Sequence, residues 1–232
     1  FPLTPLGFSW TRKKGQRRAQ NLDGANYSMP GDLQAFTQGE NIVVNNKLII
    51  ETRKENSSGL VWKMPAGFVP ENFEYTSGIV SSANSFWQED GLFEAKIKFN
   101  PAKEIASSFS LQGEKHPFRL ILMEMGAKNR LGISRFQDNK WHFDGLDISS
   151  LKKGKWYIFS LEKKGSELTW KINERVVCHT QSKQVNFPLH MNLLSIVVSL
   201  VPGSHLPYRF ETDWIKCYRL KSSAVEKRVP KT

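Results

Sequence analysis

Hydrophobic and polar residues alternate without interruption along residues 91–99. One set of alternate positions is apolar and the other is mostly charged: Phe93, Ala95, Ile97 and Phe99 against Leu92, Glu94, Lys96 and Lys98. A period of two places alternate side chains on opposite faces of an extended chain. The pattern therefore predicts a β-strand here with one buried face.

Similar segments recur at spacings of roughly 8–15 residues. Residues 41–44 and 47–53 flank Asn45 and Asn46, which is typical of two strands around a tight turn. Residues 193–201 are a continuous apolar run, typical of a strand buried on both faces. Further strands are predicted at 76–82, 106–111, 118–125, 131–136, 140–143, 156–162, 167–172, 175–180 and 208–220. Because no segment has a sustained helical period, we expect an all-β sandwich.

Two charged residues, Arg119 and Glu124, interrupt the otherwise apolar stretch 118–126. Plain alternation puts them on opposite faces of a strand, whereas one extra residue, a β-bulge, puts them on the same face. Charges on an apolar strand are costly unless they are paired or line a cleft. The alternative is an ordinary core strand with both charges at its solvated ends.

The chain of 232 residues carries 33 Lys and Arg against 22 Asp and Glu, a net charge of +11. This charge favours anionic partners such as acidic polysaccharide, lipid or nucleic acid, although it also serves solubility alone. The two cysteines, Cys178 and Cys217, exclude a disulfide scaffold or a zinc module, and whether they form one bridge stays open. No apolar run reaches the length of about 18 residues that a membrane helix needs.

We expect a single domain over residues 1–232. Residues 1–40 are rich in Pro and Gly and are predicted to be irregular. Within them, residues 11–18 hold five basic side chains, which suit either a polyanion contact or a solvated loop. Residues 221–232 form a basic tail that is expected to fray.

Six segments, in the same order along residues 41–220, resemble motifs of the family 16 glycoside hydrolases, the laminarinase, lichenase, agarase and carrageenase group. They are residues 45–50, 75–82, 90–98, 156–162, 169–176 and 213–218. The resemblance implies a concanavalin-like β-jelly roll of two curved antiparallel sheets, with a glycan cleft across the concave sheet. It also implies an extracellular, periplasmic or cell-surface location, and neither a cofactor nor a metal.

The family's catalytic strand, written E-x-D-x-x-E or E-x-D-x-E, is similar to residues 119–124. The resemblance assigns Arg119 to the nucleophile position, Ile121 to the Asp position and Glu124 to the acid/base position. The shorter spacing assigns Leu120 and Leu122 instead of Arg119 and Ile121, and it too leaves one carboxylate. The family's cleft tryptophan corresponds to Ser110.

A guanidinium cannot attack an anomeric carbon, because it stays protonated. Beside Glu124, Arg119 is expected to hold that carboxylate ionised, the wrong state for a general acid. We therefore predict a catalytically impaired scaffold that binds polysaccharide, with Arg119 contacting an acidic or sulfated sugar.

Aromatic residues that stack on sugar rings are the other binding candidates. They are Trp87, Trp141 and Phe86, with His142 and Arg135 nearby; core packing is the alternative for each aromatic residue.

Two other functions remain open. The first is a working glycosidase or lyase that uses Glu124 with a partner from elsewhere, such as Asp144, Glu114 or His142. The second is a structural or protein-interaction sandwich, or a nucleic-acid binder that acts by charge alone.

Overall fold

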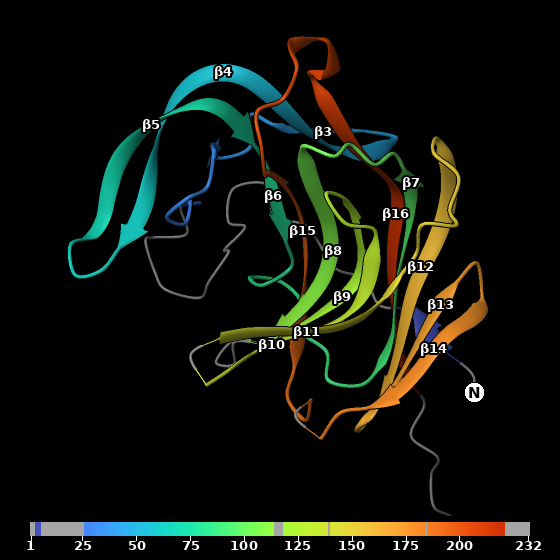
Figure 1. The fold of residues 1–232 in the computed structure, drawn as a ribbon. Helices are drawn as coiled ribbons and strands as arrows, with labels where there is room; N and C mark the ends of the chain where they lie inside the picture. Colours follow the sequence, from blue (N-terminus) through green and yellow to red (C-terminus); the bar gives the residue numbers. More distant parts are fainter. Residues whose placement is uncertain (1–2, 6–25, 114–117, 139, 184, 221–232) are drawn as a thin grey trace, which may run out of the picture.

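The structure, a computed structural model, describes residues 3–5, 26–113, 118–138, 140–183 and 185–220. Almost all of its regular elements are β-strands, which form two sheets stacked face to face (Figure 1). Within the described residues, the one helix is the 3₁₀ turn η1 (Gly203–His205). The predicted all-β sandwich is therefore confirmed.

The larger sheet has ten strands, with a main path of β14-β13-β12-β7-β16-β4-β5-β2 and with β1 and β3 attached to β16 and β4. Their bounds are β1 (Leu3–Pro5), β2 (Gln34–Phe36), β3 (Ile42–Asn45), β4 (Lys47–Lys63), β5 (Gly67–Ser77), β7 (Gly91–Phe99), β12 (Lys155–Lys164), β13 (Glu167–Ile172), β14 (Arg175–Gln181) and β16 (Tyr208–Leu220). Only the β2–β5 pair within this path is parallel.

The smaller sheet has six strands in the order β11-β10-β9-β8-β15-β6, all paired antiparallel. Their bounds are β6 (Ile79–Ser81), β8 (Ile105–Gly113), β9 (Phe118–Gly126), β10 (Arg130–Gln137), β11 (Lys140–Asp147) and β15 (Leu189–Val197). This sheet contains the stretch with Arg119 and Glu124.

The core lies between the two sheets and follows the period of two. On β7 the side chains of Phe93, Ala95, Ile97 and Phe99 are buried, while the alternate positions are half-buried, as their alternation predicts. They pack against apolar side chains of the smaller sheet, among them Phe109 and Leu120. Burial of such apolar surface is the main stabilisation of a sandwich of this kind.

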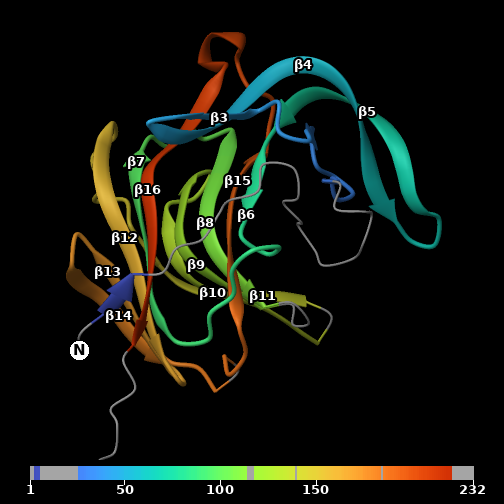
Figure 2. The ribbon, with the colours of Figure 1, turned by 180° about the vertical axis from the view of Figure 1, so that it is seen from behind.

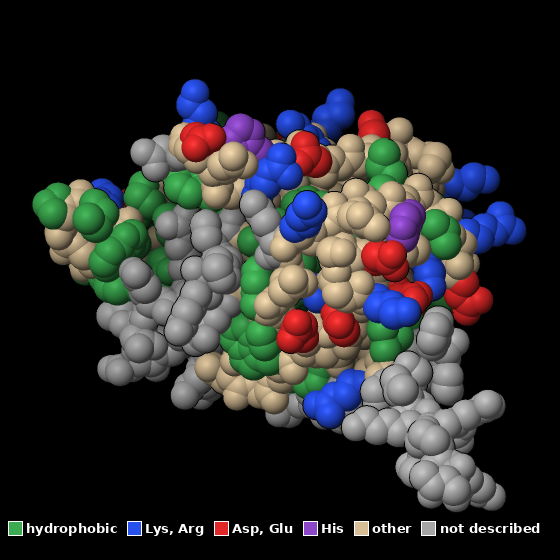
Figure 3. All heavy atoms as spheres, turned by 90° about the horizontal axis from the view of Figure 1, so that it is seen from below, with side chains coloured by type: hydrophobic (Ala, Val, Ile, Leu, Met, Phe, Trp, Pro, Cys, Tyr) green, Lys and Arg blue, Asp and Glu red, His purple; other side chains and the backbone are tan. Residues whose placement is uncertain are grey.

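A long hairpin of β4 and β5 extends beyond the packed sheets (Figures 1 and 2). The sequence pattern predicted a strand only to residue 53 and none at 67–75, so most of this hairpin was missed. Its apolar tip is visible from below, on a face that also carries basic and acidic side chains near one another (Figure 3). Met64, in the turn of the hairpin, is 79% exposed.

Two other strand boundaries differ from the predictions. The buried run predicted at 193–201 begins earlier and ends at Val197, and Val198 and Leu200 are exposed in the following loop. Residues 1–40, predicted to be irregular, include the short strands β1 and β2. The basic segments 11–18 and 221–232 lie outside the described residues.

Cys178 and Cys217 are both free thiols, so the bridge that the sequence left open is not formed. The Sγ atom of Cys217 lies 3.3 Å from Sδ of Met191 in the core. Across the described ranges, no helix is long and apolar enough to cross a membrane.

Candidate functional site

A β-bulge on β9 decides which way its two charged side chains face. Across β8, Arg119 pairs with Gln112 and Glu124 pairs with Ser108, so six residues of β9 oppose five of β8. Ile121 and Met123 also have partners, which leaves Leu122 as the extra residue. The bulge puts Arg119, Ile121 and Glu124 on one face of the sheet.

This face points away from the core, because the neighbouring positions Leu120, Leu122 and Met123 lie in the core cluster. The strand registers place side chains of β15, β10 and β11 on the same face. We call it the polar face; it comprises Ser108, Ser110, Gln112, Arg119, Ile121, Glu124, Arg130, Ser134, Phe136, Trp141, Phe143, Asp147, His190 and Asn192.

Glu124 is ion-paired with Arg130, which lies opposite it on β10. The Nε–H group of Arg130 donates to Oε1 of Glu124 over 3.0 Å, and both side chains are largely buried. The guanidinium also lies 3.7 Å from the centre of the Phe143 ring. The expectation that Arg119 pairs with Glu124 was therefore wrong: Arg119 is half-buried farther along the strand, and the ion pair comes from the next strand.

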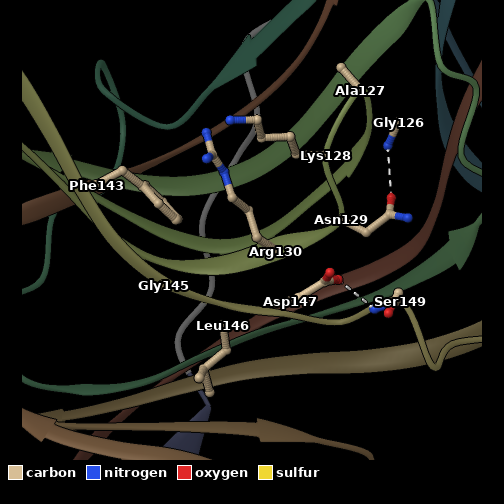
Figure 4. A pocket seen from close by; sticks show the side chains of 10 residues that line it. All are labelled: Gly126, Ala127, Lys128, Asn129, Arg130, Phe143, Gly145, Leu146, Asp147 and Ser149. Carbon is tan, nitrogen blue, oxygen red and sulfur yellow. Dashed lines mark hydrogen bonds between the residues drawn. The ribbon is translucent and has the colours of Figure 1, made fainter.

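An open pocket of about 490 Å³ lies beside this ion pair, at the turn from β9 to β10 (Figure 4). Its lining includes Lys128, Arg130, Phe143 and Asp147. The turn is closed by Asn129, whose Oδ1 accepts a hydrogen bond from the backbone N–H of Gly126 over 3.0 Å. The pocket thus combines two cations, one carboxylate and an aromatic ring.

A second polar cluster lies on β8 and β15, where Ser110 is paired in register with Asn192. Ser110 Oγ, Asn192 Oδ1 and His190 Nδ1 are buried and have no hydrogen-bond partner among the residues that the structure describes. The Nδ2 amide of Asn192 donates to His190 Nε2 over 3.0 Å. Buried polar atoms are normally paired, so this cluster has unused hydrogen-bonding capacity.

Burial lowers the pKa of His190 to about 4, so its imidazole is neutral at neutral pH. With Nε2 accepting from Asn192, the remaining ring nitrogen Nδ1 carries the proton, and this donor has no partner in the described part of the chain. Sequence reasoning did not single out His190 or Asn192. Their signal was two polar residues at alternate positions of a buried and mostly apolar strand.

Two of the predicted aromatic residues lie near these clusters. Trp87 is half-buried, donates from Nε1 to the carbonyl of Ala83 over 2.6 Å, and packs edge-on against His190 at 4.4 Å between ring centres. Trp141 is 53% exposed on the polar face and packs against Phe136. Phe86 is buried in the core, which is the alternative that the sequence left open.

The structure does not bring Arg135 or His142 to the polar face. Ser134 pairs with Arg119, so the next residue, Arg135, and its register partner His142 point to the opposite side. Arg135 instead pairs with Asp144, 2.9 Å away, on that opposite side. Glu114 lies outside the described residues.

A different acidic residue, Asp147, shares the polar face with Glu124. Arg130 pairs in register with Glu124 on one side and with Asp147 on the other. The Oδ1 atom of Asp147 accepts the backbone N–H of Ser149 over 2.9 Å. In the described chain, no three His, Cys, Asp or Glu residues gather as a metal site would require.

Solved structures with this fold include several glycan-degrading enzymes. The laminarinase catalytic domain from Thermotoga maritima MSB8 has a TM-score of 0.67 and 18% identity over 83% of this chain and 85% of that chain. SCLam, a non-specific endo-β-1,3(4)-glucanase from family GH16, has a TM-score of 0.66 and 16% identity over 91% and 84%.

The κ-carrageenase from Pseudoalteromonas carrageenovora, in complex with an oligotetrasaccharide of κ-carrageenan, has a TM-score of 0.64 and 14% identity over 92% and 96%. No protein-family model and no curated protein matches the sequence. The chain has the jelly-roll fold of the family 16 glycoside hydrolases, as its motif order predicted.

Proposed function

We propose that this protein binds a polysaccharide on its polar face and does not cleave it by the family 16 mechanism. The observation that carries the proposal is the ion pair of Glu124 with Arg130, on a strand whose other charged position is Arg119. The fold supports a glycan ligand, because the solved structures that share it include laminarinases and a carrageenase.

The retaining mechanism needs two carboxyl groups about 5–5.5 Å apart, one as nucleophile and one as proton donor. Glu124 is the one acidic residue of β9, and Arg119 and Ile121 replace the other two positions of the motif. The Oε1 atom of Glu124 accepts a hydrogen bond from Arg130, so this oxygen is already occupied by a cation of the next strand. Loss of one of two cooperating carboxyls usually removes several orders of magnitude in rate.

Glycan binding requires apolar platforms and hydrogen-bonding groups along one face. The exposed pair Phe136 and Trp141 supplies the platforms at one end of β10 and β11, and the Arg130 pocket lies at the other end. The span of β10 from residue 130 to 136 is about 20 Å at the usual rise per strand residue. Arg119, which is half-buried on β9, lies between these ends and supplies a third contact for an extended oligosaccharide.

The test combines a binding assay with a product assay. We expect migration of the protein in affinity electrophoresis to slow in gels that contain a polysaccharide from a neutral and sulfated panel. Release of reducing sugar from the same panel should stay at the blank level for the wild type and for Glu124→Gln. Retardation by none of the glycans would overturn the proposed binding, and product that disappears in Glu124→Gln would show that the protein is a working hydrolase.

A working hydrolase is the second candidate function, and one specific observation favours it. Asp147 is the acidic residue that shares the polar face with Glu124, with their α-carbons about 10 Å apart at two strand spacings. The partners that the sequence suggested, Asp144 and His142, point to the opposite side. A hydrolase that uses Glu124 and Asp147 predicts reducing-sugar release that both Glu124→Gln and Asp147→Asn abolish.

Binding of nucleic acid by charge alone gains no support from the face seen in Figure 3. In Figure 3 acidic side chains lie among the basic ones on the face seen from below. Such a complex should weaken steeply with salt, and a neutral-glycan complex should not. A location outside the cell stays a prediction.

A further inference from the structure

We propose that Lys128 and Arg130 form a binding site for an anionic substituent of the glycan, a sulfate ester or a carboxylate, and that Glu124 positions Arg130 for this contact. The inference rests on the proposed function and deepens it. It gives the residue at the acid/base position a new role: it orients a cation instead of transferring a proton.

Arg130 is held in place from two sides. Its Nε–H group donates to Glu124, and its Cζ atom lies 3.7 Å from the centre of the Phe143 ring. The bond to Glu124 is the one hydrogen bond that the Arg130 side chain makes within the described residues, and Arg130 lines the open pocket. A guanidinium fixed in this way presents two parallel N–H groups, which match two oxygens of a carboxylate or sulfate.

Lys128 adds a second charge to the same pocket. It is exposed, and its ammonium has no ion-pair partner among the described residues. Figure 4 shows the charged ends of Lys128 and Arg130 on the same side of the view, away from Asp147. The Asp147 carboxylate instead faces the backbone N–H of Ser149. The cations therefore gather at one side of the pocket, where an anion meets attraction.

A neutral sugar gains little from this arrangement, because it carries no charge that the two cations can pair with. An anionic substituent gains charge-assisted hydrogen bonds from a guanidinium that is already oriented, so less conformational freedom is lost on binding. The contact is also screened by salt, since the pocket is open to water.

Calorimetry with laminarin and with chemically sulfated laminarin compares a neutral and a sulfated form of the same polysaccharide. Polygalacturonate tests binding of a polysaccharide that carries carboxylates instead of sulfates. We expect the wild type to bind an anionic polymer more tightly than laminarin, with the preference falling as salt rises. Lys128→Ala and Arg130→Lys should each weaken anionic binding by about fivefold to tenfold, as loss of one charge-assisted contact predicts. Lys54→Ala is the matched control, because Lys54 is exposed on β4 in the other sheet.

The role of Glu124 is tested by two substitutions. Glu124→Gln keeps an oxygen that accepts from Arg130 Nε, and should retain anionic binding. Glu124→Ala frees the guanidinium and should weaken anionic binding to the level of Arg130→Lys, with laminarin binding unchanged. Equal affinity of both Glu124 variants for the anionic polymer would overturn the positioning role.

Inorganic sulfate tests the anion site in an experiment that needs no glycan. Sodium sulfate, compared with sodium chloride at equal ionic strength, should raise the Tm of the wild type more than that of Lys128→Ala. If no polysaccharide binds but this difference persists, the proposed function fails and the anion site stands. If glycans bind but sulfation, Lys128→Ala and Arg130→Lys change nothing, the anion site fails and the proposed function stands.

Discussion

The indole of Trp170 on β13 donates a hydrogen bond from Nε1 to the backbone carbonyl of Ile121 on β9, over 3.2 Å. The bond crosses the core and joins the larger sheet to β9, the strand of the smaller sheet that carries Arg119 and Glu124. It ends next to the bulged residue Leu122. The backbone that sets the direction of these charges is therefore anchored by the opposite sheet.

Trp170→Phe should lower the free energy of unfolding by about 2–3 kcal/mol. The substitution leaves the Ile121 carbonyl without its partner and removes part of a fully buried ring. Urea denaturation, monitored by circular dichroism, measures the decrease in the free energy of unfolding. Trp141→Phe is the matched control and should change stability by less than about 0.5 kcal/mol, because that ring is half exposed. Equal losses for both variants would contradict the anchoring role.

Gly126→Ala should destabilise the fold by more than about 3 kcal/mol or prevent folding. Gly126 has φ +115°, and an added Cβ would lie 1.6 Å from the carbonyl oxygen of Ile105. Gly154→Ala is the comparison, because Gly154 also has a positive φ of +80° but open space around it. That control should cost only about 1 kcal/mol. Soluble yield and urea midpoints of the two variants distinguish steric from purely conformational strain.

The free energy of unfolding should fall as the pH is lowered from 7 to 5, in part because of His190. Its folded-state pKa is about 4 and its unfolded value is 6.5, so between these values the unfolded chain binds more protons. The loss from this one group is about 2 kcal/mol at pH 5.

The lowered pKa values of Glu51 and Glu211 act in the same direction, and the raised pKa of Glu94 acts against it. Comparison with His190→Gln isolates the histidine, since the other groups are common to both proteins. Urea titrations at pH 7, 6 and 5 should show a shallower decline for the variant. Parallel declines would contradict the buried neutral imidazole.

Trp141→Ala should weaken glycan binding by about fivefold, as loss of one aromatic platform predicts. Arg135→Ala and His142→Ala should leave the affinity unchanged, because both side chains lie on the opposite side of the sheet. Affinity electrophoresis on the best ligand of the panel compares the three variants directly. A loss in Arg135→Ala as large as in Trp141→Ala would place the ligand on the other face.

Local patterns were sufficient where a strand's own side chains decide its faces. Residues 91–99 became β7 with the buried and half-buried positions that their alternation indicated. The outer part of β4 was not predicted as a strand, because residues 54–59 are mostly polar and have no period of two. It is a strand because the ladder to β5 satisfies its backbone groups.

The sequence by itself determined the jelly roll and the presence of Arg119 where the family's motif has a nucleophile. Only the tertiary structure decided that Arg130 pairs with Glu124, that Asp147 shares their face, and that Ser110 meets Asn192. These contacts join different strands, so they depend on register and on the bulge at Leu122. A shift of one residue turns every later side chain to the other face, and no local pattern of the chain encodes that shift.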